Sequence, residues 1–333
     1  MKEKYNVAII GAGIIARQMS DTLVGMENTV PYAIASRDLD RAKAYQEQYG
    51  FKKAFGSYEE MLRDPDIDLV YIATPHSHHA EHALMCLDAG KPVLVEKAFS
   101  YHSRLARQVL DKSKEKGLYA GEAIWPRYMP MSRTIRDFVD SGRFGRPTGL
   151  HASLGYNVYG KAPRLREPSL AGGALLDVGV YVLTFASIAF GDDIRRITGT
   201  ATMDPIGVDA SNSILIEYND GRQATLFDSI VSFTDRQGLI AFEDGCLIVG
   251  NVNNFEYMDA ISVDRVTHER QVVEHILRPQ QITGFEYEVQ SALDAIAAGR
   301  IESPEMPHEE ILKVMGWMDD LRAQFGLVYP MEK

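Results

Sequence analysis

The sequence has little cysteine, no excess of positive charge and no long hydrophobic run. Its 2 cysteines form no CxxC pair, which excludes a disulfide framework and a zinc knuckle and predicts a reducing, cytoplasmic setting. Lys and Arg number 35 against 46 Asp and Glu, so a formal net charge of −11 leaves no basic field to attract nucleic acid. The longest apolar stretch, Val178–Phe190, is shorter than the roughly 18 residues that a membrane span needs.

What remains has the composition of an ordinary globular protein. Hydrophobic residues make up 45% and charged residues 24% of the 333 residues, which is enough for a sizeable core and suggests about two domains. The apolar start contains Gly11 and Gly13 and is followed by Arg17, so it predicts a strand rather than a signal peptide.

Residues 1–123 alternate short apolar runs with helical stretches. Continuous β-prone runs occur at Tyr5–Ile10, Val30–Ser36 and Asp68–Ala73. Asp38 is expected to cap a helix that runs to Tyr49. Continuous apolar strands separated by helices are typical of a parallel sheet that is covered on both faces. We therefore predict an α/β Rossmann domain, a doubly wound parallel sheet, over residues 1–123.

The pattern changes after this point. Strand-like runs follow one another, some joined by hairpin signals such as Asn219-Asp220-Gly221, and two helices, Phe285–Ala298 and His308–Phe325, come last. Residues 124–333 are thus predicted to form one α+β domain with a mostly antiparallel sheet and with its helices segregated in sequence.

A glycine-rich turn links the first strand to the first helix. In Gly11-Ala12-Gly13-Ile14-Ile15-Ala16, Gly11 permits a tight turn, Gly13 lets the backbone approach a pyrophosphate, and Ala16 lets the helix pack closely on the strand. The strand–turn–helix context favours dinucleotide binding over an empty turn.

The end of the second strand bears on the choice of cofactor. NAD sites usually place Asp or Glu there to bind the ribose 2′-hydroxyl, whereas this chain has Ser36 and Arg37. Both side chains can donate to a 2′-phosphate, so the sequence favours NADP(H), with NAD(H) as the alternative. Asp38 is expected to point away from the phosphate, into the first turn of its own helix.

Two further segments carry polar residues where such sheets bind ligands. Thr74-Pro75-His76 begins a histidine-rich run that continues to His82, and Glu96-Lys97 ends the fourth predicted strand. Four histidines suggest metal, but no carboxylate or cysteine completes a ligand set nearby, so we predict contacts to the cofactor and no metal.

A polar pair interrupts the apolar helix after Ala171-Gly172-Gly173. Asp177 and Tyr181 are four residues apart and are expected on one helix face. An aspartate in such a helix is costly unless it is paired, so Asp177 either caps the helix or serves a site, while core packing alone is the alternative for Tyr181.

These motifs together resemble the glucose–fructose oxidoreductase / inositol dehydrogenase (Gfo/Idh/MocA) family along essentially the whole chain. The resemblance rests on the Gly11 turn, on ATPHSHH ending at His79, on AGKPVLVEK ending at Lys97, and on GGALLDVGVY ending at Tyr181. The segment from Glu122 to Pro130 is similar to the dimeric dihydrodiol dehydrogenase and NADP-dependent xylose dehydrogenase branch. Ala98 stands where the family has a proline.

The resemblance implies nicotinamide hydride chemistry and assigns the site residues. It also implies that residues 124–333 are built on a large open, mostly antiparallel sheet and serve substrate binding and oligomerisation. The implied catalytic residues are Lys97, Asp177 and Tyr181. The implied cofactor-binding residues are Gly11, Gly13, Ile14, Ile15, Ser36, Arg37, Thr74, Pro75, His76, His79, Glu96, Lys97, Trp125, Arg127 and Arg164. The implied substrate-binding residues are Lys97, Trp125, Tyr156, Asp177 and Tyr181.

The expected reaction follows from these residues. Oxidising a secondary alcohol removes a hydride from carbon and a proton from oxygen, so a base is needed. A phenol is a poor base at neutral pH, but a nearby ammonium favours the phenolate, so Tyr181 is the expected acid/base, assisted by Lys97 and Asp177.

We therefore predict an NADP(H)-dependent oxidoreductase that acts on a sugar, polyol or cyclic diol. The alternatives are an NAD-dependent glycosidase that uses transient oxidation, and a nucleotide-binding regulator without turnover. Alternating apolar residues in Gln223–Phe233 give the open sheet a second apolar face, which predicts a homodimer or homotetramer without nucleic-acid or membrane partners.

Overall fold

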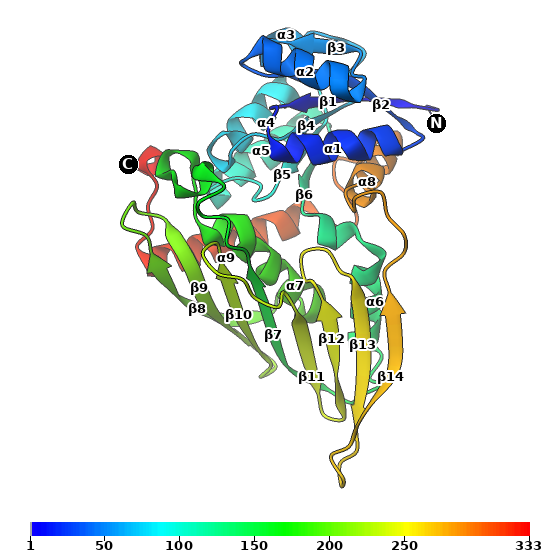
Figure 1. Cartoon of the computed structure of the whole chain (residues 1–333), viewed down its shortest axis with the longest axis vertical. Helices are drawn as coiled ribbons and strands as arrows, with labels where there is room; N and C mark the ends of the chain where they lie inside the picture. The colour runs from blue at the N-terminus through cyan, green and yellow to red at the C-terminus, as the bar shows by residue number, and fades with distance from the viewer. Residues whose placement is uncertain (1) are drawn as a thin grey trace. The chain divides into compact units, whose positions relative to one another are not determined.

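A computed structural model describes residues 2–333 and divides the chain into two compact units. The first unit extends to Tyr128 and also contains Gln281–Met315. The second comprises Met129–Gln280 and Gly316–Lys333. Each unit has its own sheet (Figure 1).

The first unit is built on a six-stranded, wholly parallel sheet in the order β3-β2-β1-β4-β5-β6. Its strands are β1 (Tyr5–Ile10), β2 (Thr29–Ala35), β3 (Lys53–Phe55), β4 (Leu69–Ile72), β5 (Val93–Glu96) and β6 (Ala120–Ala123). Its helices are α1 (Ile14–Gly25), α2 (Leu39–Tyr49), α3 (Tyr58–Leu62), α4 (His79–Asp88), α5 (Ser103–Lys116), α8 (Glu286–Ala297) and the beginning of α9 (His308–Phe325). The order reverses between β1 and β4, and the predicted doubly wound fold is confirmed.

Local sequence signals set the helix ends. Asp38 caps α2 by accepting from the backbone N–H of Asp40 and of Arg41, at 3.1 and 3.2 Å. Gly50 ends α2 in the left-handed conformation with φ 73°. The predicted helix from Asp38 to Tyr49 is therefore confirmed.

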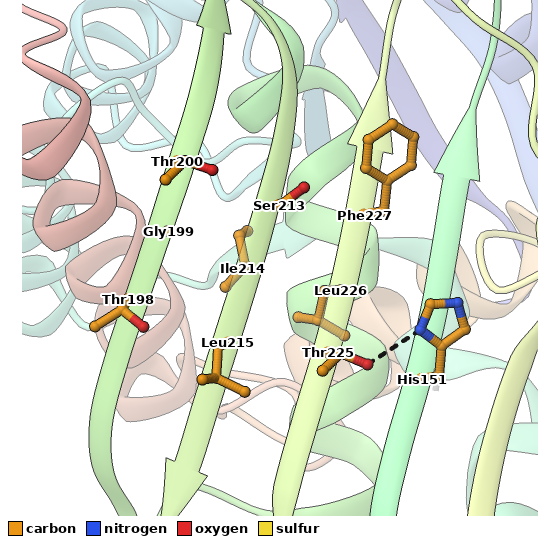
Figure 2. Close-up of a pocket in the computed structure, with 10 residues that line it drawn as sticks. All are labelled: His151, Thr198, Gly199, Thr200, Ser213, Ile214, Leu215, Thr225, Leu226 and Phe227. Atoms are coloured by element: carbon orange, nitrogen blue, oxygen red, sulfur yellow. Dashed lines mark hydrogen bonds between the residues drawn. The ribbon is translucent and has the colours of Figure 1, made fainter.

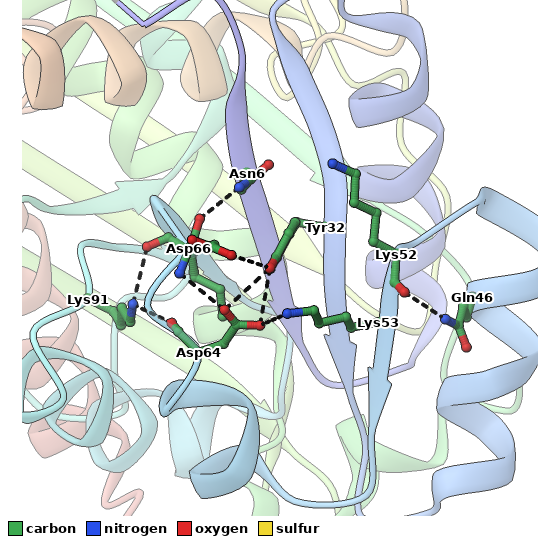
Figure 3. A network of polar contacts seen from close by, with 9 residues as sticks. Asn6, Tyr32, Gln46, Lys52, Lys53, Asp64, Asp66 and Lys91 are labelled. Atoms are coloured by element: carbon green, nitrogen blue, oxygen red, sulfur yellow. Dashed lines mark hydrogen bonds and ion pairs between the residues drawn. The ribbon is translucent and has the colours of Figure 1, made fainter.

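A polar network closes the sheet at the amino ends of its strands (Figure 3). Asp64 accepts from the Lys53 ammonium at 2.6 Å, and the backbone carbonyl of Asp64 accepts from the Lys91 ammonium at 2.6 Å. Tyr32 donates to Asp66 at 3.1 Å, and the Asn6 amide donates to the Asp66 carbonyl at 2.8 Å. These contacts stabilise the fold at the amino ends of the strands, which is the edge of the sheet opposite to Gly11.

The C-terminal segment Gln281–Met315 belongs to the first unit, which differs from the predicted division at residue 123. The reason is hydrophobic: Val289 and Leu293 of α8 are 1% exposed and share one core with Ile9 and Leu94 of the parallel sheet. Helix α8 therefore completes the cover of that sheet although it follows the second unit's strands in the chain.

The second unit contains an eight-stranded sheet in the order β14-β13-β12-β11-β7-β10-β9-β8. Its strands are β7 (Pro147–Gly155), β8 (Ile194–Met203), β9 (Asp209–Tyr218), β10 (Gln223–Ser229), β11 (Gly238–Phe242), β12 (Gly245–Gly250), β13 (Tyr257–Val263) and β14 (Arg270–Leu277). Only the β7–β10 pair is parallel, so the predicted mostly antiparallel sheet is confirmed. The hairpin at Asn219-Asp220-Gly221 joins β9 to β10 as predicted.

Helices cover one face of this sheet. Helix α6 (Pro130–Asp140) packs on α7 (Val180–Phe190), and α7 lies on β7 and β10. The segment Pro168–Phe190 is long and apolar enough to cross a membrane, which differs from the shorter stretch counted above, but its apolar window is 100% buried as a core helix.

The other face of the sheet is open within the chain. Along β10, Ala224 and Leu226 are 0% and 3% exposed on the covered side, whereas Thr225 is exposed and Phe227 is half-buried. A pocket along β7, β8, β9 and β10 is lined by His151, Thr198, Gly199, Thr200, Ser213, Ile214, Leu215, Thr225, Leu226 and Phe227 (Figure 2). The predicted alternation is therefore confirmed for Thr225, Leu226 and Phe227, whereas Ile230, Val231 and Phe233 lie beyond the last residue of β10.

Three buried glutamates lie in the first unit, at the carboxyl ends of β5 and β6 and on α8. They are Glu96, Glu122 and Glu288, at 5%, 1% and 0% exposure. Burial, together with the charge of Glu96, raises the pKa of Glu122 to about 8. Burial also raises the pKa of Glu288 well above its ordinary value, and neither carboxyl oxygen of Glu288 has a hydrogen-bond partner among residues 2–333.

This burial predicts a pH-dependent stability. Between the ordinary pKa of 4.5 and about 8, folded Glu122 binds more protons than unfolded Glu122, so the free energy of unfolding falls as pH rises through that window. Glu122→Gln keeps the side-chain oxygen but does not titrate, so its unfolding free energy should decline less steeply. Urea unfolding at intervals from pH 5 to 9 measures this, with the exposed Glu47→Gln as control. Equal slopes for wild type and Glu122→Gln would contradict it.

Candidate functional site

The glycine turn at the start of α1 fits a pyrophosphate. Gly11 has φ 98°, and a Cβ on it would lie 2.7 Å from the Ala73 carbonyl oxygen, so only glycine fits. A Cβ on Gly13 would meet nothing within 4 Å, which leaves open space beside the backbone. Helix α1 has no side-chain cap and no acidic residue in its first turn, so its amides are available to an anion.

The structure brings the predicted turn residues together at this point. Ile14 is 75% exposed and Ile15 is half-buried, both in the first turn of α1. The Tyr45 hydroxyl on α2 donates to the Gly13 carbonyl at 2.7 Å and so orients the Gly13 peptide. Sequence reasoning missed Tyr45, because a tyrosine at helical spacing resembles an ordinary core residue.

The end of β2 presents a cation without a competing carboxylate. Ser36 is buried, Arg37 is exposed, and the Asp38 carboxylate faces into its own helix as expected. The Ser36 hydroxyl accepts from the Asp38 backbone N–H at 3.2 Å. This arrangement can receive a phosphate at the adenosine ribose.

The histidines act as hydrogen-bonding and packing groups. The two ring nitrogens of His79 lie 2.7 Å from the Thr74 carbonyl and 2.8 Å from the Ala98 carbonyl, so this ring joins the loops after β4 and β5. Pro75 precedes a short 3₁₀ turn that contains His76, whose ring centroid lies 5.6 Å from that of His79.

His82 packs behind this loop. Its Nδ1 lies 3.0 Å from the Thr74 hydroxyl. Burial, together with the nearby His78, His79 and Arg37, lowers the pKa of His82 to about 4, so the ring is neutral at physiological pH. Among residues 2–333, no group of three or more histidine, cysteine or acidic side chains is placed to hold a metal ion.

The backbone around Lys97 is held by two buried carboxylates. Glu96 accepts from the Lys97 backbone N–H at 3.2 Å, and Tyr71 donates to Glu96. Glu122 accepts from the Phe99 backbone N–H at 2.8 Å. The Lys97–Ala98 peptide bond is cis. Glu122 is a second residue that sequence reasoning missed, since a lone glutamate on a strand carries no motif.

Trp125 and Arg127 have partners in the C-terminal part of the first unit. The Trp125 ring packs on Phe285 with 4.5 Å between centroids. The buried Arg127 guanidinium pairs with Glu310 at 2.8 Å and donates to the Glu305 carbonyl at 3.1 Å. These contacts give both residues a role in the fold, and their contact with a cofactor stays a prediction.

In the second unit, Asp177 lies on a π-helical turn rather than on the predicted regular helix. The turn spans Leu175–Gly179, and α7 begins at Val180. The spacing of apolar residues does not reveal this wider turn. π-Helical turns occur frequently at functional sites.

The Asp177 carboxylate pairs with Arg164. The two groups are 3.0 Å apart, and the Asp177 side chain is 11% exposed while that of Arg164 is 45% exposed. Arg164 was predicted to contact the cofactor and Asp177 to assist Tyr181. The structure pairs the two side chains with each other, and both roles stay predictions. Tyr181, on the first turn of α7, is 8% exposed.

Tyr156, a predicted substrate residue, lies at the end of β7 and is half-buried. Its hydroxyl donates to the Asn253 side chain at 3.1 Å and accepts from Arg236 at 3.4 Å. Tyr156 thus belongs to a polar cluster with Asn253 and Arg236, and its role toward substrate stays a prediction.

Sequence comparisons agree with this arrangement. Residues 5–122 match the oxidoreductase family with an NAD-binding Rossmann fold, and residues 132–251 match the GFO/IDH/MocA C-terminal domain. Trans-1,2-dihydrobenzene-1,2-diol dehydrogenase of Xenopus tropicalis is 31% identical over 314 residues, with 93% of each chain covered. The Homo sapiens enzyme of the same name is 28% identical, with 98% of each chain covered.

Solved structures share the fold. A 3-ketoreductase from Actinomadura kijaniata in complex with NADP and TDP-benzene superimposes with a TM-score of 0.87 at 24% identity, covering 97% of this chain and 98% of that one. Levoglucosan dehydrogenase in complex with NADH gives a TM-score of 0.86 at 17% identity, covering 97% of each chain. From the glycine turn, the two domain matches and the dehydrogenase relatives together, the chain belongs to the Gfo/Idh/MocA oxidoreductase family and is an NAD(P)-dependent oxidoreductase.

Proposed function

We propose that this protein transfers a hydride between NADP(H) and a secondary alcohol or carbonyl of a sugar, polyol or cyclic diol. The observation that carries the proposal is the uncapped start of α1 beside Gly13, followed at the end of β2 by Ser36 and Arg37. The diol class is supported by relatives named dihydrodiol dehydrogenase, and the sugar class by a structural neighbour named levoglucosan dehydrogenase.

The cofactor supplies or accepts the hydride when bound, and the protein's residues manage the proton. Tyr181 is the proposed acid/base, because its phenol can exchange a proton with the reacting oxygen. Lys97 donates a hydrogen bond to that oxygen and favours the phenolate. Asp177, which pairs with Arg164 at 3.0 Å, accepts from a neighbouring substrate hydroxyl.

Replacing the proton-transfer group tests this assignment. Tyr181→Phe removes only a hydroxyl, so turnover should fall by about 10²–10⁴-fold while the Kd for NADPH stays within twofold. NADPH oxidation against a panel of ketoses, aldoses and cyclic diketones measures turnover, and fluorescence titration measures the Kd. Tyr218→Phe is the matched control, because the Tyr218 hydroxyl is buried without a hydrogen-bond partner among residues 2–333. Turnover near that of the wild type in Tyr181→Phe, with chemistry limiting, would refute the role.

Cofactor preference tests whether Ser36 and Arg37, at the end of β2, bind the 2′-phosphate. A charge-assisted bond from Arg37 to the 2′-phosphate should favour NADPH over NADH by about 1.5–3 kcal/mol. Ser36→Asp with Arg37→Ile should shift the preference toward NADH, because it adds repulsion and removes attraction. The control is Arg41→Ile, an exposed cation on α2 that should leave the preference unchanged. Tighter binding of NADH than NADPH by the wild type contradicts the proposal.

We also propose a homodimer through the open face of the eight-stranded sheet. The pocket there is lined by hydroxyls, apolar groups and the His151 imidazole, and by no Asp, Glu, Lys or Arg (Figure 2). Such a face suits a second protein surface better than water. Light scattering at micromolar concentration should give twice the monomer mass, and Leu215→Arg should halve it, whereas Leu277→Arg, at the 67% exposed end of β14, should not. A monomeric wild type would exclude the dimer.

A further inference from the structure

Three buried polar side chains of the second unit's sheet form a bar beneath the π-helical turn. Asp209 and Asn212 lie on β9, and Asp228 lies on β10 opposite Asn212 in the antiparallel register. They are 0%, 1% and 0% exposed. The two amide hydrogens of Asn212 are divided between the carboxylates, with 2.7 Å to Asp209 Oδ2 and 2.7 Å to Asp228 Oδ1.

The turn rests on both ends of this bar. The Leu175 backbone N–H donates to Asp209 Oδ2 at 2.6 Å, two residues before Asp177. A Cβ on Gly173 would lie 2.0 Å from Asp209 Oδ1, so no side chain fits there. A Cβ on Gly179 would lie 3.0 Å from Asp228 Oδ2. The backbone that carries Asp177 is thus pressed against one aspartate at each end.

The two carboxyl groups differ in their surroundings. Burial raises the pKa of both, and the bond from Asn212 opposes this at each. At Asp209 the backbone N–H of Leu175 opposes it as well, whereas the charge of Asp209 raises the pKa of Asp228 further, well above its ordinary value. Asp209 is therefore the carboxyl group that binds the backbone of the turn, and Asp228 reaches Asp209 only through Asn212.

Packing alone does not account for this arrangement. Asp209 Oδ1, Asp228 Oδ2 and Asn212 Oδ1 have no hydrogen-bond partner among the described residues, which is costly in a core. Apolar residues of similar volume often stabilise a fold equally well or better. The polar bar instead fixes one geometry for the peptide at Leu175.

We propose that Asp209 is a positioning residue that acts through the Leu175 backbone to fix the π-helical turn, and hence the place of Asp177, while Asn212 holds the Asp209 side chain in place. The role of Asp177 in the reaction rests on the proposed function, whereas the hold on the turn does not.

The two isosteric amide variants separate the aspartates. Asp209→Asn should raise the hydrogen-exchange rate of the Leu175 amide and lower kcat, each by about tenfold, because an amide oxygen is a weaker acceptor than a carboxylate. Asp228→Asn keeps an oxygen that can accept from Asn212 and does not bind Leu175, so it should leave both within twofold. The Kd for NADPH should be unchanged in both variants. If Asp209→Asn does not fold, Asn212→Ser, which removes the support of Asp209, should show the same pattern to a smaller degree.

A double-mutant cycle distinguishes positioning from a general loss of structure. In the Asp177→Asn background, Asp209→Asn should no longer lower kcat, because its effect passes through Asp177. Equal effects of Asp209→Asn and Asp228→Asn, an unchanged exchange rate at Leu175, or an additive cycle would overturn the proposal. A wild type that turns over no substrate of the panel would refute the proposed function instead, and the exchange rate would still decide whether Asp209 holds the turn.

Discussion

In each unit, a buried carboxyl group accepts a backbone N–H two residues from a predicted site residue. In the first unit Glu122 binds the amide of Phe99, two residues after Lys97, and in the second Asp209 binds the amide of Leu175, two residues before Asp177. Neither carboxylate needs to touch substrate. Each fixes the peptide geometry of a segment that carries a predicted substrate-binding side chain, Lys97 in the first unit and Asp177 in the second. A buried acceptor can impose that geometry because leaving the amide unpaired would be costly.

Burying carboxyl groups in this way has an electrostatic cost. Burial raises the pKa of Glu122 and Glu288 in the first unit and of Asp209 and Asp228 in the second. Arginines pair with two other acidic side chains, Arg164 with Asp177 and Arg127 with Glu310. The acidic excess of the sequence is therefore partly internal, and the exposed end of β2 still offers Arg37 to an anion.

The sequence predicted the elements whose signals are local. The glycine turn, the Asp38 cap and the hairpin after Asn219 each depend on neighbouring residues, and all were predicted correctly. The place of α8 was not predicted, because Val289 and Leu293 meet their core partners more than 190 residues away in the chain. Edge strand β14 was missed, since Arg270–Leu277 is largely exposed and carries no apolar run. The Arg164–Asp177 pair and the bar around Asn212 were equally invisible, because they arise only when strands and turns pack together.

Membership in the oxidoreductase family follows from two domain matches and from dehydrogenase relatives along nearly the whole chain. The central claim beyond that is net hydride transfer to a substrate carbonyl, and isotope transfer tests it most directly. NADPH that carries deuterium at the transferring C4 position is incubated with each carbonyl of the panel, and the product is analysed by mass spectrometry. The account predicts one deuterium on the carbinol carbon of the product for each NADPH consumed. A product without deuterium, or hydrolysis with no net consumption of NADPH, would contradict it.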